Sequence, residues 1–382
     1  MFPSAMIRTS RNLMSRIFKS YCLPIKKDTF QITNTQINPF SSKSMKVAIL
    51  GAASKTGNLG SHPFHFSIVY LIIYRLCCHV IGSGLALFLK QSPLIDEVAI
   101  FDSKCIYGLA LDLNYIDTSC KVSTCNCPGT SLEHTLDEAK VVMIVADETI
   151  KEKSNAYEVL KSNADVLSDL LPNVIKFSPQ AMIAVVMNPI NSLIPLALEM
   201  YKKAGIYEHN RLFGVINHYS LRANTFAAEM IGIEPEYMMV PIIGGGCCKT
   251  CIPLFSQAKP SSKLSQTEIR RLTHAVRMSD EEPSKANKDE EKPCLATSFA
   301  AARFCVSLCK AIRHERNVVE SAYVRSCVIP ELTYFATPLE LGPAGIQKYL
   351  GIPSLTNYEC ELLNSVRPSL KKDIKLGEVT RH

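Results

Sequence analysis

The chain has 382 residues, enough to bury a large core and to form two domains. Hydrophobic residues make up 47% of it and charged residues 20%, a balance that excludes a disordered or collagen-like protein. The formal net charge is +7, but residues 1–45 hold seven Lys or Arg and one acid, so they supply +6 of it and bulk charge gives no support for a nucleic-acid partner.

The segment from Met1 to Tyr21 has the composition of a mitochondrial presequence. It holds four basic residues, no acidic residue, several serines and apolar residues between the charges. The alternative is a basic tail without a targeting role, but the acid-poor, amphipathic spacing favours targeting. We therefore treat residues 1–45 as presequence and linker, and expect a protein of the mitochondrial matrix.

The fifteen cysteines form no regular framework, and no secretory signal precedes them. Free thiols in a reducing compartment are therefore expected. Two close pairs, Cys125 with Cys127 and Cys248 with Cys251, have no matching second pair at zinc-finger spacing, so we expect no metal site.

Four short apolar runs end at a turn or a polar residue, as buried parallel strands do. They cover residues 46–50, 98–101, 141–145 and 182–186. Segments with helical periodicity lie between them, for example residues 85–91 and 157–171. This alternation predicts an α/β fold, a Rossmann-type doubly wound parallel sheet over residues 46–190, with ligands at the carboxyl ends of the strands.

After the fourth run the pattern changes to longer amphipathic segments, which predicts an α+β substrate domain over residues 191–382. Residues 241–243 are a candidate strand, and residues 267–278 and 297–311 are candidate helices. The densely charged run 280–292 is expected to be a solvated loop or a frayed helix end.

A glycine turn follows the first strand, from Gly51 to Gly57 (GAASKTG). Such turns bring backbone N–H groups and a helix N-terminus to a pyrophosphate, although Ser54 stands where close approach favours glycine. The acid that holds the adenosine ribose is expected about 20 residues after such a motif. Asp102 ends the second strand, 45 residues after Gly57 but 20 after Gly82.

Removing residues 57–81 restores that spacing, so this stretch is an insertion within the turn. Arg75 is its one charged residue, and it is rich in Phe, Ile, Tyr and Cys. A transmembrane helix would need a longer apolar run than the nine residues 66–74. A functional lid and a translated, unspliced intron are the other interpretations, and we favour the intron. If the insertion is real, it splits the phosphate-binding turn and weakens cofactor binding.

Several segments closely resemble mitochondrial-type malate dehydrogenases of the lactate/malate dehydrogenase family. With residues 57–81 removed, the first turn resembles the family's GAAGGIG turn, and residues 242–250 (IIGGGCCKT) resemble its GGHAGKT segment. Four more segments match in order and spacing: residues 188–192 (NPINS), 211–215 (RLFGV), 221–224 (LRAN) and 335–342 (FATPLELG). The resemblance runs from about Lys46 to the C-terminus and implies NAD as cofactor and a small dicarboxylate as substrate.

The resemblance also implies catalytic positions, and four of them hold unsuitable residues. Gly246 stands in place of the acid/base His, and Tyr219 in place of the Asp that orients it. Ile150 and Ala156 stand in place of the two arginines of the mobile loop, whose Gly and Pro hinge residues are also absent. Loss of an acid/base costs roughly 10²–10⁴ in rate, so malate oxidation near background is expected.

Three polar positions of the family remain. Arg222 matches the arginine that clamps a substrate carboxylate, Asn188 would bind substrate or nicotinamide, and Asn163 matches an asparagine of the helix after the loop. For each of the three, the simpler interpretation is a polar residue at the end of a strand or helix whose hydrogen bonds are satisfied within the fold. His218 is a poor candidate for a replacement base, because it is adjacent to Tyr219 and successive residues of a helix point about 100° apart. Lys151 could supply a positive charge near the loop, but without the planar, forked guanidinium of arginine.

Three functions follow from this pattern. The first is a malate dehydrogenase homologue with weak or no activity, retained as a binding or structural subunit. The second is an active malate dehydrogenase, and the third is the same fold acting on or binding a different ligand. The resemblance implies a homodimer, or a heterodimer with an active paralogue, and we expect no membrane partner and no nucleic acid.

Overall fold

The computed structural model describes residues 45–50, 76–102, 106–124, 132–145, 156–206, 208–261, 263–287 and 294–380. Ser44 to His382 form one compact unit. Several predictions lie outside the described residues: the presequence, Gly51, Gly57, Ile150, Lys151, Cys125, Cys127 and the insertion up to residue 75. Ala156 is described only as the first residue of a helix.

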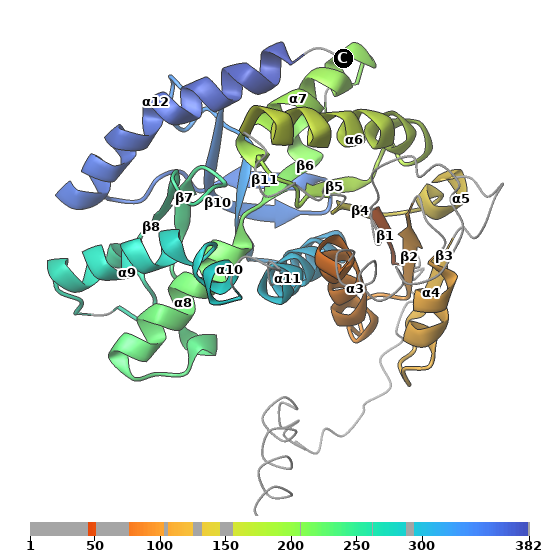
Figure 1. Cartoon of the computed structure of the whole chain (residues 1–382), viewed down its shortest axis with the longest axis horizontal. Helices are drawn as coiled ribbons and strands as arrows, with labels where there is room; N and C mark the ends of the chain where they lie inside the picture. Colours follow the sequence, from red (N-terminus) through yellow and green to blue (C-terminus); the bar gives the residue numbers. More distant parts are fainter. Residues whose placement is uncertain are drawn as a thin grey trace, which may run out of the picture. The chain divides into compact units, whose positions relative to one another are not determined.

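The described strands and helices alternate through the first half of the chain (Figure 1). The strands are β1 (Lys46–Leu50), β2 (Glu97–Phe101), β3 (Lys121–Thr124), β4 (Val141–Ile144), β5 (Met182–Val185), β6 (Leu212–Val215), β7 (Ile242–Gly244), β8 (Cys251–Pro253), β9 (Val318–Arg325), β10 (Tyr334–Gly342) and β11 (Gly345–Tyr349). The helices are α3 (Leu76–Lys90), α4 (Tyr107–Asn114), α5 (Leu132–Leu136), α6 (Ala156–Phe177), α7 (Ile190–Lys203), α8 (Asn217–Ile231), α9 (Gln266–Met278), α10 (Glu282–Ala286), α11 (Leu295–Ile312) and α12 (Asn357–Val379).

The strands form one sheet with a parallel half and an antiparallel half. The order is β3-β2-β1-β4-β5-β6-β9-β10-β7-β8, with β11 added to β10. Strands β1 to β6, which are neighbours in this order, are mutually parallel, and β9 pairs with β6 in the antiparallel direction. The chain reverses its direction of winding between β1 and β4, which is where α/β sheets of this kind bind ligands. The predicted Rossmann-type sheet is confirmed, while the domain boundary at residue 190 stays a prediction.

Helices cover both faces of the sheet, and this explains the continuous apolar runs of the strands. Helices α6, α7 and α12 lie over one face, and α3 and α11 over the other (Figure 1). All four residues of β4 and of β5 are buried, as expected for strands that are covered on both sides. α11 is the one helix of the described chain that is long and apolar enough to span a membrane, and half of it is buried in this core.

Local signals explain where several helices begin and end. Ser265 with Glu268 and Thr356 with Glu359 form capping boxes, which satisfy backbone N–H groups at the starts of α9 and α12. Gly232 ends α8 with a φ of 73°, a left-handed conformation that glycine adopts without strain. The helices predicted over residues 267–278 and 297–311 are confirmed as α9 and α11.

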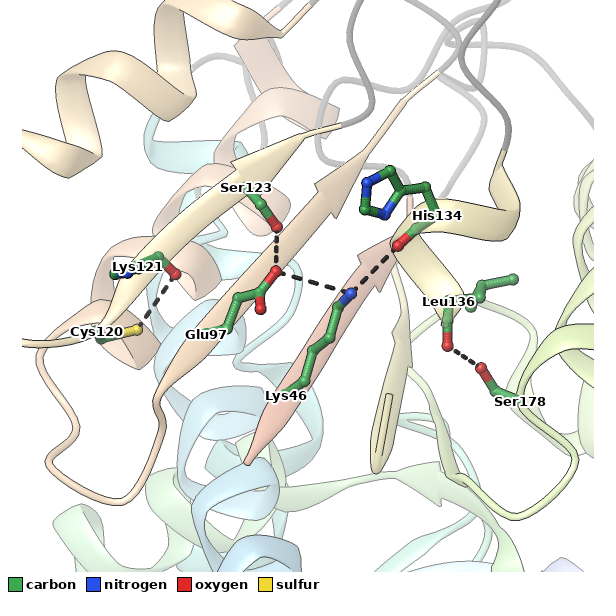
Figure 2. A network of polar contacts seen from close by, with 8 residues as sticks. All are labelled: Lys46, Glu97, Cys120, Lys121, Ser123, His134, Leu136 and Ser178. Atoms are coloured by element: carbon green, nitrogen blue, oxygen red, sulfur yellow. Dashed lines mark hydrogen bonds and ion pairs between the residues drawn. The ribbon is translucent and has the colours of Figure 1, made fainter. Parts of the chain in front are cut away.

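A polar network ties together the amino-terminal ends of the first strands (Figure 2). Lys46 Nζ lies 3.7 Å from Glu97 Oε1 and donates to the carbonyl of His134 at 3.2 Å. Ser123 Oγ donates to the same Glu97 oxygen. Because Lys46 and Glu97 are the first residues of β1 and β2, this network fixes the sheet edge opposite the one where ligands are expected.

The described part of the charged run after α9 is mostly exposed, as predicted, but it differs from the prediction at Asp280 and in forming a short helix. Residues 282–286 form the short helix α10, and Asp280 is largely buried against α8 rather than solvated. The correction has a physical reason, because the neighbouring helix supplies partners for this carboxylate that a local sequence pattern does not reveal.

Candidate active site at the carboxyl edge of the sheet

A cavity of about 570 Å³ lies where β5 ends, beside α8 and the loop after β7. It is lined by polar and sulfur-containing side chains together with one proline: Asn188, Pro189, Tyr219, Cys247, Cys248, Asp280, Glu281, Ser284 and Lys285. Two of the predicted positions, Asn188 and Tyr219, therefore meet here, and the loop that contains Gly246 forms one wall.

Asn188 is positioned from behind by Asn163. The Asn163 side chain is fully buried in α6, and its Nδ2 donates to the carbonyl oxygen of Asn188 at 2.6 Å. The structure thus brings these two predicted residues together, with Asn188 at the cavity wall and Asn163 supporting its backbone. Asn163 is not among the residues that line the cavity.

Gly246 lies in a tightly packed loop between β7 and β8. Its N–H donates to Asn191 Oδ1 at 2.7 Å, and Asn191 Nδ2 donates to Thr250 Oγ1 at 3.3 Å and to Asp373 Oδ2 at 3.0 Å. A Cβ atom at position 246 would lie 1.9 Å from Ile190 Cγ2. The space that a side chain at position 246 would need is therefore filled by α7.

Tyr219 and Arg222 of α8 hold the carboxylate of Asp280 between them. Tyr219 Oη donates to Asp280 Oδ2 at 2.7 Å, and Arg222 Nη1 donates to Oδ1 of the same group. The Arg222 guanidinium also lies 5.9 Å from the Tyr219 ring centre. Arg222, predicted to bind a substrate carboxylate, has a carboxylate of its own chain as its partner.

The pKa values of the ionisable groups that are shifted around the cavity all move away from neutral pH. Burial, with the nearby charge of Asp280, raises the pKa of Tyr219, and burial raises the pKa of the Cys248 thiol. Burial opposes ionisation of Asp280, but the charges of His218 and Arg222 and the Tyr219 hydrogen bond outweigh it and lower its pKa. A hydrogen bond from Lys285 lowers the pKa of Glu281. An acid/base catalyst works best when its pKa is near the operating pH, and none of these shifts provides that.

His218, the candidate replacement base, does not line this cavity. Its ring centre lies 4.0 Å from that of Tyr219. Among the described residues, no group of three or more His, Cys, Asp or Glu side chains is arranged to hold a metal ion.

Among the expected nucleotide positions that the structure describes, Asp102 and Asn188 both follow carboxyl ends of strands in the parallel half of the sheet. Asp102 follows β2, beside the point where the winding reverses, and is 8% exposed. Gly82 lies within α3, because this helix begins six residues earlier, at Leu76. The last residues of the insertion therefore extend the helix, and Ser298 Oγ donates to the carbonyl of Ile81 at 3.1 Å.

Sequence reasoning missed three residues that shape the site: Ile190, Asn191 and Asp280. Ile190 and Asn191 belong to the segment 188–192, which follows directly on a predicted strand. This position at a strand end could have marked them as site residues. Asp280 had no such signal, because its partners lie 58 and 61 residues away in the chain.

Two family models match the chain in succession. The model described as the NAD binding domain of lactate/malate dehydrogenase matches residues 78–214, and that of the alpha/beta C-terminal domain matches residues 220–380. Mitochondrial malate dehydrogenase of Caenorhabditis elegans is 36% identical over 337 residues, which are 88% of this chain and 91% of that protein. The Homo sapiens mitochondrial malate dehydrogenase is 38% identical over 298 residues, 78% of this chain and 88% of its own.

Solved structures with the same fold include malate dehydrogenase of Cryptosporidium parvum, with a TM-score of 0.69 at 20% identity over 88% of this chain and 99% of that one. The lactate dehydrogenase of the same organism, complexed with lactic acid and β-nicotinamide adenine dinucleotide, also has a TM-score of 0.69 at 20% identity, over 89% and 99% of the two chains. At this identity the likeness shows the fold.

Proposed function

The chain belongs to the lactate/malate dehydrogenase family, and we propose that it is a mitochondrial member with little or no malate dehydrogenase activity that retains a nucleotide-binding site. The packing of Gly246 against Ile190 carries this proposal. The loop position that should present an acid/base has no side chain, and the adjoining helix occupies the space that one would need.

The chemistry explains why this position matters. Oxidation of a 2-hydroxy acid removes a hydride from carbon and a proton from oxygen, so a base must stand at the hydroxyl group. Tyr219 and Cys248 hold their protons more tightly than usual, and Asp280 is a weak base already engaged by two donors. The described residues around the cavity therefore supply no well-matched proton acceptor.

The described part of the nucleotide site fits NAD. Asp102 places a mostly buried carboxylate at the end of β2, where it would accept hydrogen bonds from the adenosine ribose hydroxyls. The backbone carbonyl and side chain of Asn188 lie at the end of β5, beside the cavity in which the nicotinamide would sit. NAD, when bound, supplies the hydride acceptor.

A protein partner is the second part of the proposal. Exposed apolar side chains gather on three neighbouring helices: Leu87 on α3, Tyr107 and Leu111 on α4, and Leu295 and Phe299 on α11. Phe88 and Phe299 pack edge to face across α3 and α11, so these helices present a joint surface. We assign this surface to pairing with a second copy of the chain, or with an active paralogue.

Binding of a different ligand is the other candidate function, and the altered lining of the cavity favours it. Cys247, Cys248, Asp280 and Glu281 together offer sulfur atoms and acidic groups, beside the single cation Lys285 among the described lining residues. The mitochondrial relatives and the composition of residues 1–21 support a location in the matrix for either function.

One experiment separates these functions. NADH binding is measured by the increase in its fluorescence, and NADH oxidation is followed with oxaloacetate and with a panel of other 2-oxo acids. Binding without oxidation supports the proposal, and oxidation by another 2-oxo acid supports the different-ligand function. Oxidation by oxaloacetate at a rate near that of an active family member would refute the loss of activity.

A further inference from the structure

The contact between Arg222 and Asp280 bears on which ligands the cavity accepts. Arginine binds carboxylates through paired, charge-assisted hydrogen bonds, and a mostly buried guanidinium strongly favours an anionic partner. Here the Arg222 and Asp280 side chains are 16% and 23% exposed, and the partner comes from the chain itself. Tyr219 donates to the second oxygen of the same carboxylate, so both oxygens are engaged.

Lys285, the cation among the described residues that line the cavity, is also paired. Lys285 Nζ lies 2.8 Å from Glu281 Oε2, and both side chains are more than half exposed. Arg222 is not among the residues that line the cavity, but its partner Asp280 is, so Arg222 and Lys285 are each paired with a carboxylate of the cavity wall. An incoming anion would have to displace one of these carboxylates.

We propose that Asp280, which lines the cavity, is a built-in carboxylate that occupies the neighbouring Arg222 guanidinium, so that Arg222 is withheld from free carboxylate ligands. Asp280 is thereby the residue that determines which ligands the cavity admits. The inference rests on the proposed function, because it treats this cavity as the site where family members bind substrate.

Tethering explains why free carboxylates fail to compete. A group held on the same chain acts at an effective concentration of roughly millimolar or more, even on a flexible linker. Asp280 is held more firmly than that, because it follows directly on α9 and precedes α10. Its lowered pKa keeps it anionic at neutral pH, so the pairing persists there.

The test uses the full-length chain and sodium oxalate as the probe, in isothermal titration calorimetry at low ionic strength and without nucleotide. Asp280→Ala is expected to bind oxalate at least about tenfold more tightly than the wild type, the effect of roughly one charge-assisted hydrogen bond. Asp280→Asn, which keeps the size of the side chain, should show a smaller gain and serves if the alanine variant is poorly folded.

Two further variants identify the cause of a gain. Asp280→Ala combined with Arg222→Gln should lose it, because the guanidinium is the proposed anion site. Glu281→Gln leaves Arg222 paired and releases only Lys285, whose side chain is 61% exposed, so its gain should be smaller than that of Asp280→Ala. Wild-type binding as tight as that of Asp280→Ala would overturn the inference, as would a gain that survives Arg222→Gln or the absence of a gain in both folded Asp280 variants.

The readout keeps this inference separate from the proposed function. No NADH is present, so the heats of oxalate binding do not depend on catalysis. Wild-type turnover of oxaloacetate would defeat the proposed function in a separate assay, whereas the oxalate titrations alone decide the role of Asp280.

Discussion

A Cβ atom on Gly246 would lie 1.9 Å from Cγ2 of Ile190, a separation that no pair of carbon atoms without a bond between them tolerates. Ile190 is buried at the start of α7, directly after the strand end that positions Asn188. The loop after β7 and the helix after β5 are therefore packed together at the place where a dehydrogenase of this family needs a projecting base.

Gly246→Ala should lower the free energy of unfolding by about 1–3 kcal/mol, the usual cost of overpacking a well-filled core. Urea unfolding measures the change. Adding Ile190→Ala should remove part of the Gly246→Ala cost, so the two substitutions are expected to be non-additive. Gly108→Ala is the matched control, because a Cβ at this helical glycine meets nothing within 4 Å and should be neutral or stabilising. Equal effects at positions 246 and 108 would contradict the packing described for the loop.

Asp280→Asn should change how stability depends on acid pH. The pKa of Asp280 is lowered in the folded chain, so its ionised form stabilises the fold above the unfolded pKa of about 3.9. That contribution is lost as the pH falls through the lower folded pKa. Urea midpoints between pH 2 and 7 should therefore fall more steeply in the wild type than in Asp280→Asn below about pH 4. Parallel curves for the two proteins would show that Asp280 gains nothing from its partners.

The strands could be predicted from the sequence, but the role of Asp280 could not. The apolar runs predicted the parallel strands, and their ends placed Asp102 and Asn188 on one edge of the sheet, since strand burial is a local pattern. A charged run is usually solvated, so residues 280–292 were expected in solvent. Only the folded chain brings Asp280 to Arg222, and only tertiary packing fills the space beside Gly246 with Ile190.

Deleting residues 57–81 should tighten NADH binding at least about tenfold, the equivalent of one hydrogen bond to a charged group. The deletion joins the two parts of the glycine turn and removes the first six residues of α3, so that backbone N–H groups and a helix that starts near Gly82 approach the pyrophosphate together. Fluorescence titration with NADH measures the affinity. Asp102→Asn in the shortened chain is the control and should weaken binding again. Unchanged affinity after the deletion would mean that the insertion does not obstruct the nucleotide site.

Replacing Leu295 and Phe299 with lysine should convert a dimer to monomers. Both side chains are exposed on α11, 61% and 43% respectively, and a lysine there would carry its charge into the apolar pairing surface. Light scattering coupled to size-exclusion chromatography gives the mass. Val379→Lys is the control, since Val379 is equally exposed but lies on α12, over the other face of the sheet. A wild type that is monomeric at micromolar concentration would rule out self-pairing through this surface.

The central claim is the loss of malate dehydrogenase activity, and the most direct measurement is the rate of NADH oxidation by oxaloacetate. It is made at saturating NADH on the full chain and on the chain without residues 57–81, beside an active family member. Loss of an acid/base costs roughly 10²–10⁴ and loss of a charge stabiliser roughly 10²–10³, without full additivity. We expect both forms to run at least about 10⁴ times more slowly than the active enzyme. A rate within tenfold of that enzyme in either form would contradict the account.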